Sequence, residues 1–231
     1  MESLLQAGFA ALNLPAGCIP LLVRYARLLE EKNRVMNLTA ITEPEEIATL
    51  HFLDSVSLLR CADFRGKSVV DVGSGAGFPG LPLRIAEPSL RLTALDAQGK
   101  RIDFLQEVCR TLNLTDVACV HARAEEFARD HRESFDIAVS RAVASLPMLT
   151  ELALPLVKSG GLFLAMKSVD SGEELSGAAR AVELLGGAVD GVRDYTIPGT
   201  AVVHRAILIR KIHPTPAKYP RAFAKIKKAP L

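Results

Sequence analysis

The sequence predicts a Rossmann-like α/β fold, in which helices cover both faces of a mostly parallel, twisted sheet. Short apolar runs alternate with helical segments between residues 68 and 166, a pattern typical of parallel sheets. A glycine-rich segment follows directly on the first apolar run. The last two apolar runs are separated only by a short turn at Pro198-Gly199, which predicts an antiparallel hairpin at the C-terminal end of the sheet region.

Residues 1–62 are predicted to be helical and to precede the sheet. Apolar residues recur at helical spacing from Leu21 to Leu29, and a second amphipathic stretch follows the turn before Glu45. A boundary is expected between residues 63 and 67. The expected organisation is an N-terminal helical segment at 1–62, a ligand-binding sheet domain at 63–212 and a basic tail at 213–231.

The sheet domain is predicted to contain seven strands. Five apolar runs are expected to form parallel strands, at Ser68–Val72, Arg91–Leu95, Val117–His121, Phe135–Ser140 and Gly161–Met166. Helical segments are expected between and after them, at Leu81–Ala86, Lys100–Leu112, Glu125–Arg129, Leu146–Val157 and Glu173–Leu185. The hairpin strands are expected at Gly191–Ile197 and Val202–Arg210.

Composition indicates a soluble globular protein. Hydrophobic residues make up 49% of the chain and charged residues 23%, and no apolar run approaches the ~20 residues of a membrane span. The N-terminus lacks the basic region of a signal peptide. The four cysteines are widely spaced, which favours reduced thiols over a metal site or a disulfide framework. We therefore expect a cytoplasmic protein with no bound metal and no membrane partner, and expect it to be a monomer.

The charge of the chain is unevenly distributed. Residues 210–231 contain seven basic residues and no acidic one, which leaves 21 basic against 26 acidic residues in the rest of the chain. A basic tail on an acidic body is suited to holding a polyanion near a site. The alternative is a solvated, disordered end.

The strongest motif is the segment from Val69 to Gly80, VVDVGSGAGFPG. An apolar strand ends in Gly73, Gly75 and Gly77, which allow the backbone to turn and to approach a ligand closely. The spacing also satisfies the dinucleotide pattern GxGxxG, and an acidic residue follows at the distance of a ribose ligand. Asp71 distinguishes a dinucleotide from S-adenosylmethionine as the ligand of this loop. Its carboxylate would repel a pyrophosphate and would favour the sulfonium and ammonium of S-adenosylmethionine, although it could also simply order the loop.

Residues at the ends of the next strands complete the predicted ligand site. Asp96 can accept hydrogen bonds from both ribose hydroxyls. Ala124, through its amide, and Glu125, through its side chain, would lie over the adenine, unless Glu125 only favours a helix N-terminus. Arg141 ends the fourth strand, where substrate and methyl donor must meet. The alternative role for Arg141 is to form an ion pair at the surface.

The residues also restrict the kind of methyl transfer. No Pro-Cys dipeptide is present for attack on a pyrimidine, and the fourth strand ends in Ser140-Arg141-Ala142-Val143 rather than in the Asn/Asp-Pro-Pro-aromatic loop of amine methyltransferases. A purine N7 carries an in-plane lone pair and needs no general base, so its methylation is compatible with this sequence. His51 and Asp54 are three residues apart, and we interpret them as a helix staple rather than a catalytic pair. No catalytic side chain is identified.

Lys167 and several residues of the C-terminal tail are candidates for RNA contact. Lys167 ends the fifth strand and could reach a phosphate. Tyr219 and Phe223 are interleaved with Arg221 and Lys225, and aromatic residues among basic ones can stack on bases while the cations contact phosphates. The alternatives are an exposed lysine and a mobile tail.

Together these motifs resemble the RsmG (GidB) family of bacterial small-subunit rRNA methyltransferases over nearly the whole chain. The cofactor loop is especially similar, including its ending Pro79-Gly80. The other matching segments are Asn37–Ile41, His51–Ser55, Asp96 with Lys100-Arg101, Arg123–Glu126, Ser140–Ser145, Met166-Lys167 and Tyr219–Arg221. After Tyr219-Pro220-Arg221 the tail departs from the Arg-, Gly- and Pro-rich pattern of the family.

The resemblance implies a class I methyltransferase fold and a 16S rRNA (guanine-N7)-methyltransferase, acting on 16S rRNA or the small ribosomal subunit near the decoding centre. The donor S-adenosylmethionine would contact Gly73, Phe78, Ala124, Glu125 and Arg141, with Asp96 on the ribose. Two alternatives remain at this point: a nicotinamide-dependent oxidoreductase and a non-catalytic RNA-binding protein.

Overall fold

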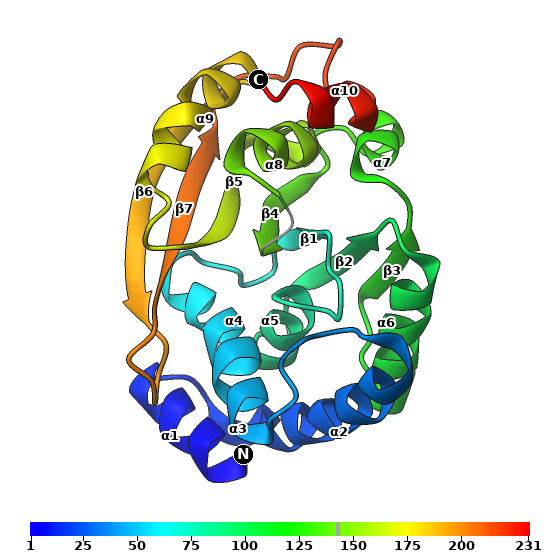
Figure 1. The fold of residues 1–231 in the computed structure, drawn as a ribbon, viewed down its shortest axis with the longest axis vertical. Coiled ribbons are helices and arrows are strands. Elements are labelled where there is room, and N and C mark those ends of the chain that lie inside the picture. Colours follow the sequence, from blue (N-terminus) through cyan, green and yellow to red (C-terminus); the bar gives the residue numbers. More distant parts are fainter. Residues whose placement is uncertain (142–143) are drawn as a thin grey trace.

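The computed structural model describes residues 1–141 and 144–231, and it is organised around a seven-stranded sheet (Figure 1). The strand order is β3-β2-β1-β4-β5-β7-β6. Neighbouring strands from β3 to β5 are parallel, whereas β7 is antiparallel to both β5 and β6. The strands are β1 (Ser68–Val72), β2 (Arg91–Asp96), β3 (Val117–His121), β4 (Phe135–Arg141), β5 (Val157–Ser168), β6 (Gly187–Thr196) and β7 (Val203–Lys211). This confirms the predicted fold class, including the antiparallel hairpin.

Helices connect the strands and cover both faces of the sheet. They are α5 (Gly80–Ala86), α6 (Gly99–Thr111), α7 (Ala124–Asp130), α8 (Leu146–Ala153) and α9 (Gly172–Leu184). Successive strand residues face opposite sides: Val69 packs in one hydrophobic cluster and Val70 in the other. Figure 1 shows the N-terminal helices, α5 and α6 on one side of the sheet and α7, α8 and α9 on the other.

The N-terminal segment packs on the same face of the sheet as α5 and α6, within one hydrophobic cluster. It contains α1 (Glu2–Ala11), α2 (Ile19–Met36), α3 (Pro44–Glu46), a π-helix (Ile47–Leu53) and α4 (Asp54–Ser57), with short 3₁₀ turns at Ala16–Cys18 and Leu58–Arg60. The predicted amphipathic helix after Glu45 is therefore interrupted by a π-helix, a feature that often occurs at functional sites. In the part of the chain that the structure describes, no helix combines the length and apolar character of a membrane span.

The C-terminal tail is folded onto the opposite face of the sheet. Arg132 donates hydrogen bonds to the backbone carbonyls of Tyr219, at 2.8 Å, and Pro216, at 3.0 Å. The chain then forms α10 (Phe223–Lys228), whose Ile226 is fully buried. The alternative of a solvated, disordered end is thus wrong, because apolar side chains of the tail complete the second hydrophobic cluster.

Candidate functional site

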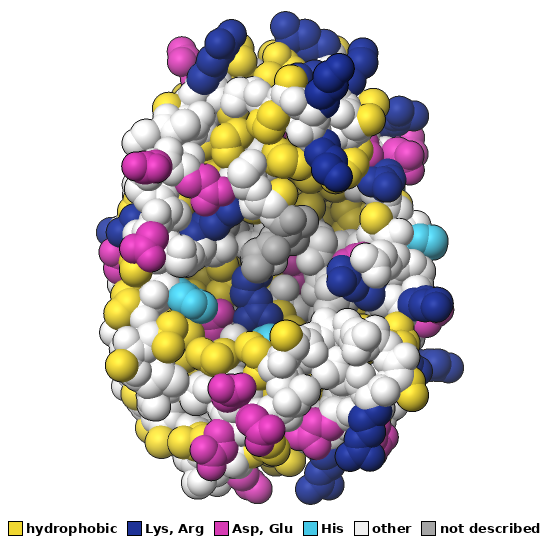
Figure 2. Space-filling model, viewed as in Figure 1, with side chains coloured by type: hydrophobic (Ala, Val, Ile, Leu, Met, Phe, Trp, Pro, Cys, Tyr) yellow, Lys and Arg dark blue, Asp and Glu magenta, His cyan; other side chains and the backbone are white. Residues whose placement is uncertain are grey.

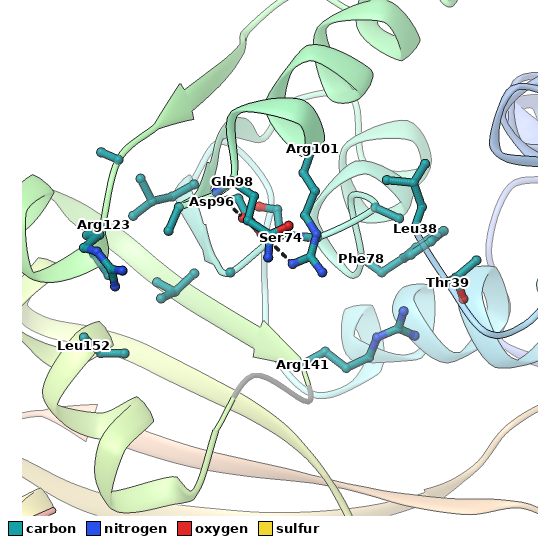
Figure 3. Close-up of a pocket in the computed structure, with 18 of the residues that line it drawn as sticks. Leu38, Thr39, Ser74, Phe78, Asp96, Gln98, Arg101, Arg123, Arg141 and Leu152 are labelled. Carbon is teal, nitrogen blue, oxygen red and sulfur yellow. Dashed lines mark hydrogen bonds and ion pairs between the residues drawn. The ribbon is translucent and has the colours of Figure 1, made fainter. Parts of the chain in front are cut away.

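A cavity of about 490 Å³ lies at the carboxyl ends of β1, β2, β3 and β4. Figure 3 shows Arg123 and Leu152 at one end, Asp96 and Gln98 in the middle, and Phe78 and Thr39 at the other end. The predicted ligand residues that line this cavity are Gly73, Gly75, Phe78, Asp96, Ala124, Glu125 and Arg141. They meet there because parallel strands place their carboxyl ends at one edge of the sheet. Asp71 and Gly77 are not among the lining residues.

Asp71 lies beneath the glycine loop. Its side chain is fully buried, and its Oδ2 accepts a hydrogen bond from the Gly80 amide at 2.9 Å. A Cβ on Gly80 would lie 2.7 Å from that oxygen, so the close approach of the loop requires glycine there. Burial raises the pKa of Asp71 to about 7. These contacts fit the alternative in which Asp71 orders the loop, and they place its carboxylate out of direct reach of the cavity.

Tyr25, on α2, supports the same loop from the N-terminal segment. Its hydroxyl donates a hydrogen bond to the carbonyl of Ala76, and its ring stacks on Phe78 with centroids 5.6 Å apart. Gly77 has a φ of +99°, and a Cβ there would collide with the Tyr25 hydroxyl. Gly77 therefore allows α2 to pack against the loop, which fixes the position of Phe78 at the edge of the cavity.

Asp96 is held in place at the centre of the cavity. Its Oδ2 accepts a hydrogen bond from the Gly75 amide at 2.9 Å, and its Oδ1 accepts one from the Gln98 amide at 2.8 Å. Arg101 approaches Oδ2 at 3.4 Å (Figure 3). Asp96 as a whole is 4% exposed. It is thus a fixed, charged acceptor, well suited to a pair of ligand hydroxyl groups.

His51 and Arg141 form the end of the cavity opposite Arg123. Arg141 Nη2 donates to His51 Nδ1 at 3.0 Å, so the imidazole proton lies on Nε2, which is 2.8 Å from the Thr39 hydroxyl. Burial and the Arg141 charge lower the pKa of His51 to about 3. The His51 ring stacks on Phe78 with centroids 4.3 Å apart. His51 is therefore neutral near pH 7, and its basic nitrogen is occupied by Arg141.

Asp54 anchors Arg141 from the same N-terminal segment. Arg141 Nη1 lies 3.3 Å from Asp54 Oδ2 and donates to the Leu50 carbonyl at 2.9 Å. The other Asp54 oxygen accepts hydrogen bonds from Tyr195 and His204, each at 2.9 Å. The interpretation of His51 and Asp54 as a local helix staple is thus incomplete, because both side chains bind Arg141 across the fold. The alternative of a surface ion pair for Arg141 is also wrong, because Asp54 is fully buried.

The predicted RNA-contacting residues have different environments. Lys167 donates to the Ala144 carbonyl at 2.7 Å and to Glu174 at 2.8 Å. Tyr219 is 7% exposed, and Arg221 binds the buried carboxylate of Glu151 through two nitrogens, at 2.8 and 2.6 Å. Lys225 is exposed to solvent. Ala142 and Val143 of the fourth-strand motif lie outside the described residues.

Figure 2 shows where charged side chains lie on the face viewed in Figure 1. Lys and Arg side chains gather over α7 and α10, at the top of this face, whereas acidic side chains gather near α3, at the bottom. Lys225, Lys227 and Lys228 of α10 are all exposed. Within residues 1–141 and 144–231, no group of three or more His, Cys, Asp and Glu side chains could hold a metal ion.

Several lining residues are not predicted by the sequence pattern alone. They are Leu38, Thr39, His51, Gln98, Arg101, Leu152 and Phe223. Thr39 and His51 belong to the N-terminal segments that carry the family resemblance, which is the one signal that could have assigned them. Nothing in the local sequence connects them to strand ends far along the chain.

Comparisons of the sequence with known proteins identify a family of methyltransferases. Residues 18–201 match a family model described as GidB, rRNA small subunit methyltransferase G. The chain is 49% identical over 210 residues to ribosomal RNA small subunit methyltransferase G of Lachnoclostridium phytofermentans, which covers 90% of this chain and 87% of that protein. It is 46% identical over 209 residues to the protein of the same name from Acetivibrio thermocellus, with 90% and 86% covered.

Solved structures with similar folds are more distant in sequence. A SAM-dependent methyltransferase from Aquifex aeolicus has a TM-score of 0.55 at 17% identity, covering 76% of this chain and 97% of that one. TrmN from Thermus thermophilus has a TM-score of 0.54 at 24% identity, covering 68% and 48%. These similarities concern the fold.

Proposed function

Since the chain belongs to the rRNA small subunit methyltransferase G family, we propose that it transfers a methyl group from S-adenosylmethionine to N7 of a guanine in 16S rRNA, near the decoding centre. The observation that carries the proposal is the cavity at the strand ends, with Asp96 fixed between the glycine loop and the start of α6. The alternative of a nicotinamide-dependent oxidoreductase is set aside, because the curated relatives are methyltransferases.

The cavity fits S-adenosylmethionine in size and in the order of its groups. Its volume, about 490 Å³, lies within the ~300–1,000 Å³ of small-ligand pockets. Asp96 would accept the ribose hydroxyls at its centre. Ala124 and Glu125, at the start of α7, would hold the adenine, and Gly73 and Arg141 would hold the methionine part.

When bound, S-adenosylmethionine supplies a methyl group on a positively charged sulfur, which leaves as a neutral thioether without acid catalysis. Guanine N7 offers a lone pair in the plane of the ring, so no proton has to be removed before attack. The contacts of His51 agree with this requirement, since Arg141 occupies its basic nitrogen. The side chains that line the cavity would align the nucleophile with the methyl group. Such alignment can accelerate a reaction by a large factor.

We also propose that RNA is the partner of the chain, and we propose an oligomeric state. Exposed lysines on α10 lie on the same face as the cavity, where they can contact phosphates of the RNA. We also propose that the chain acts as a monomer. The four free cysteines are compatible with the reducing cytoplasm.

A labelling experiment tests the function. The purified chain is incubated with S-adenosylmethionine labelled in its methyl group and with 16S rRNA or small subunits from cells lacking this protein. After nuclease digestion, we expect the label to co-elute with 7-methylguanosine and to be lost with the Asp96→Ala variant. Label on another nucleoside would contradict the proposed target atom. RNA binding without any label transfer would support the non-catalytic alternative.

A further inference from the structure

Phe223, on the C-terminal helix α10, lines the same cavity as the glycine loop although it lies 143 to 150 residues further along the chain. We propose that its ring closes the adenine end of the cofactor site, so that the C-terminal tail is part of that site. This inference rests on the proposed function, because it takes the adenine of S-adenosylmethionine as the group that contacts Phe223.

The position of Phe223 is defined by its neighbours in the cavity. It shares the lining with Leu152 of α8 and with Ala124 and Glu125 at the start of α7. The guanidinium carbon of Arg123, the residue before α7, lies 5.0 Å from the centroid of the Phe223 ring. Arg123 thus holds the ring against the beginning of α7, which is the part of the site expected to bind adenine.

The helix that carries Phe223 is anchored on both sides of this residue. Two residues earlier, the Arg221 guanidinium binds Glu151 with two hydrogen bonds, and its backbone amide binds the same carboxylate at 2.9 Å. Three residues later, Ile226 is completely buried. A six-residue helix is marginal by itself, so these contacts hold α10 in place. The ring is therefore positioned before any ligand arrives.

The chemistry of this end of the cavity suits a purine base. Phe223 and Leu152 present aromatic and aliphatic surface, while Glu125 adds a hydrogen-bond acceptor. Stacking of a base on an aromatic side chain is tolerant of sequence and contributes substantially to binding. The sequence pattern groups Phe223 with Tyr219 as a candidate for stacking on RNA bases. Its place in the cavity favours the adenine of the methyl donor over a base of the RNA.

The chain contains no tryptophan, which permits a direct spectroscopic test. Phe223→Trp introduces a single tryptophan into the full-length chain, and the tryptophan emission is followed during titration with S-adenosylhomocysteine. We expect saturable quenching with the dissociation constant that calorimetry gives for the same variant. Lys227→Trp places the fluorophore on the exposed side of the same helix, and its emission should not change.

A truncation of the side chain provides the second measurement. For Phe223→Ala we expect the affinity for S-adenosylhomocysteine and for adenosine to fall by the same factor, roughly ten-fold, with an unchanged circular dichroism spectrum. Wild-type affinity in Phe223→Ala would overturn the inference and leave the proposed function intact. A Phe223→Trp signal that responds to RNA but not to S-adenosylhomocysteine would also overturn it, in favour of base stacking. If the wild-type chain bound no S-adenosylhomocysteine at all, both the proposed function and this inference would be wrong.

Discussion

Asp54 and Arg141 form an ion pair that joins the N-terminal helical segment to the end of β4, with Oδ2 and Nη1 3.3 Å apart. Asp54 is fully buried, and its second oxygen accepts hydrogen bonds from Tyr195 on β6 and His204 on β7. One carboxylate therefore connects three parts of the fold beside the cavity. The N-terminal segment is a structural component of the site, because it sets the position of Arg141.

Asp54→Ala is expected to destabilise the protein strongly. The substitution leaves the Arg141 guanidinium without its carboxylate and removes the acceptor of two further donors. Loss of one partner from a buried pair costs about 3–5 kcal/mol, which chemical denaturation can measure. Asp63→Ala is the control, since Asp63 pairs with Arg65 at the surface, where both side chains are more than half exposed. Equal free energies of unfolding for the two variants would contradict the importance of the Asp54 network.

Asp96→Ala is expected to weaken cofactor binding. The variant loses the acceptor for the ribose hydroxyls and also the bonds that hold the amides of Gly75 and Gln98. Hydrogen bonds to charged groups contribute about 1.5–3 kcal/mol, so the dissociation constant for S-adenosylhomocysteine should rise at least about ten-fold in calorimetry. Asp103→Ala, an exposed position on α6, should bind like the wild type. An unchanged constant in Asp96→Ala would show that the ribose is held elsewhere.

Asp71→Asn is expected to change the pH dependence of stability. The pKa of Asp71 is about 7 in the folded chain and about 3.9 in an unfolded one. A group whose pKa is raised by folding contributes stability that is complete below the unfolded pKa and is lost as the pH rises through the folded pKa. The asparagine side chain of the variant would keep an acceptor for the Gly80 amide without the titration.

The measurement is the free energy of unfolding of both proteins between pH 4 and pH 8. The wild type should lose stability relative to Asp71→Asn as the pH rises, by at most roughly 4 kcal/mol. Taking the difference between the two proteins cancels the titration of the other groups. A difference that did not vary with pH would mean that Asp71 is already ionised at pH 4, as expected if it served mainly to attract a cationic ligand.

The strand ends are the part of the site that sequence can predict. Parallel strands bring their carboxyl ends to one edge, so residues that end or directly follow strands, such as Gly73, Asp96 and Arg141, must lie close together. The alternation of side chains along a strand and the spacing of glycines in a loop both depend on residues close together in the chain. Both can therefore be read directly from the sequence. The resemblance to a known family then identifies the ligand and the reaction.

The remaining lining residues depend on packing between distant segments. His51 precedes Arg141 by 90 residues, and its π-helical backbone is not visible in an amphipathic pattern. Arg221 and Lys225 are both basic residues of the tail, and the sequence does not distinguish their roles. Arg221 nevertheless binds a buried glutamate, whereas Lys225 is exposed. The difference arises from Glu151, the single acidic residue of α8, whose partner Arg221 lies 70 residues away.

Simultaneous replacement of Lys225, Lys227 and Lys228 by Ala is expected to weaken RNA binding and to reduce its salt dependence. Each phosphate contact that is lost lowers the slope of log affinity against log salt by roughly 0.7–0.9, so three contacts would lower it by about two to three. Point substitutions are preferable to truncation, because removing the tail would also remove the buried side chains of Tyr219 and Ile226. The control replaces Arg65, Lys158 and Arg193, exposed residues away from the cavity, and should leave the slope unchanged. An equal reduction in both triple variants would indicate non-specific attraction of RNA to the whole surface rather than binding at α10.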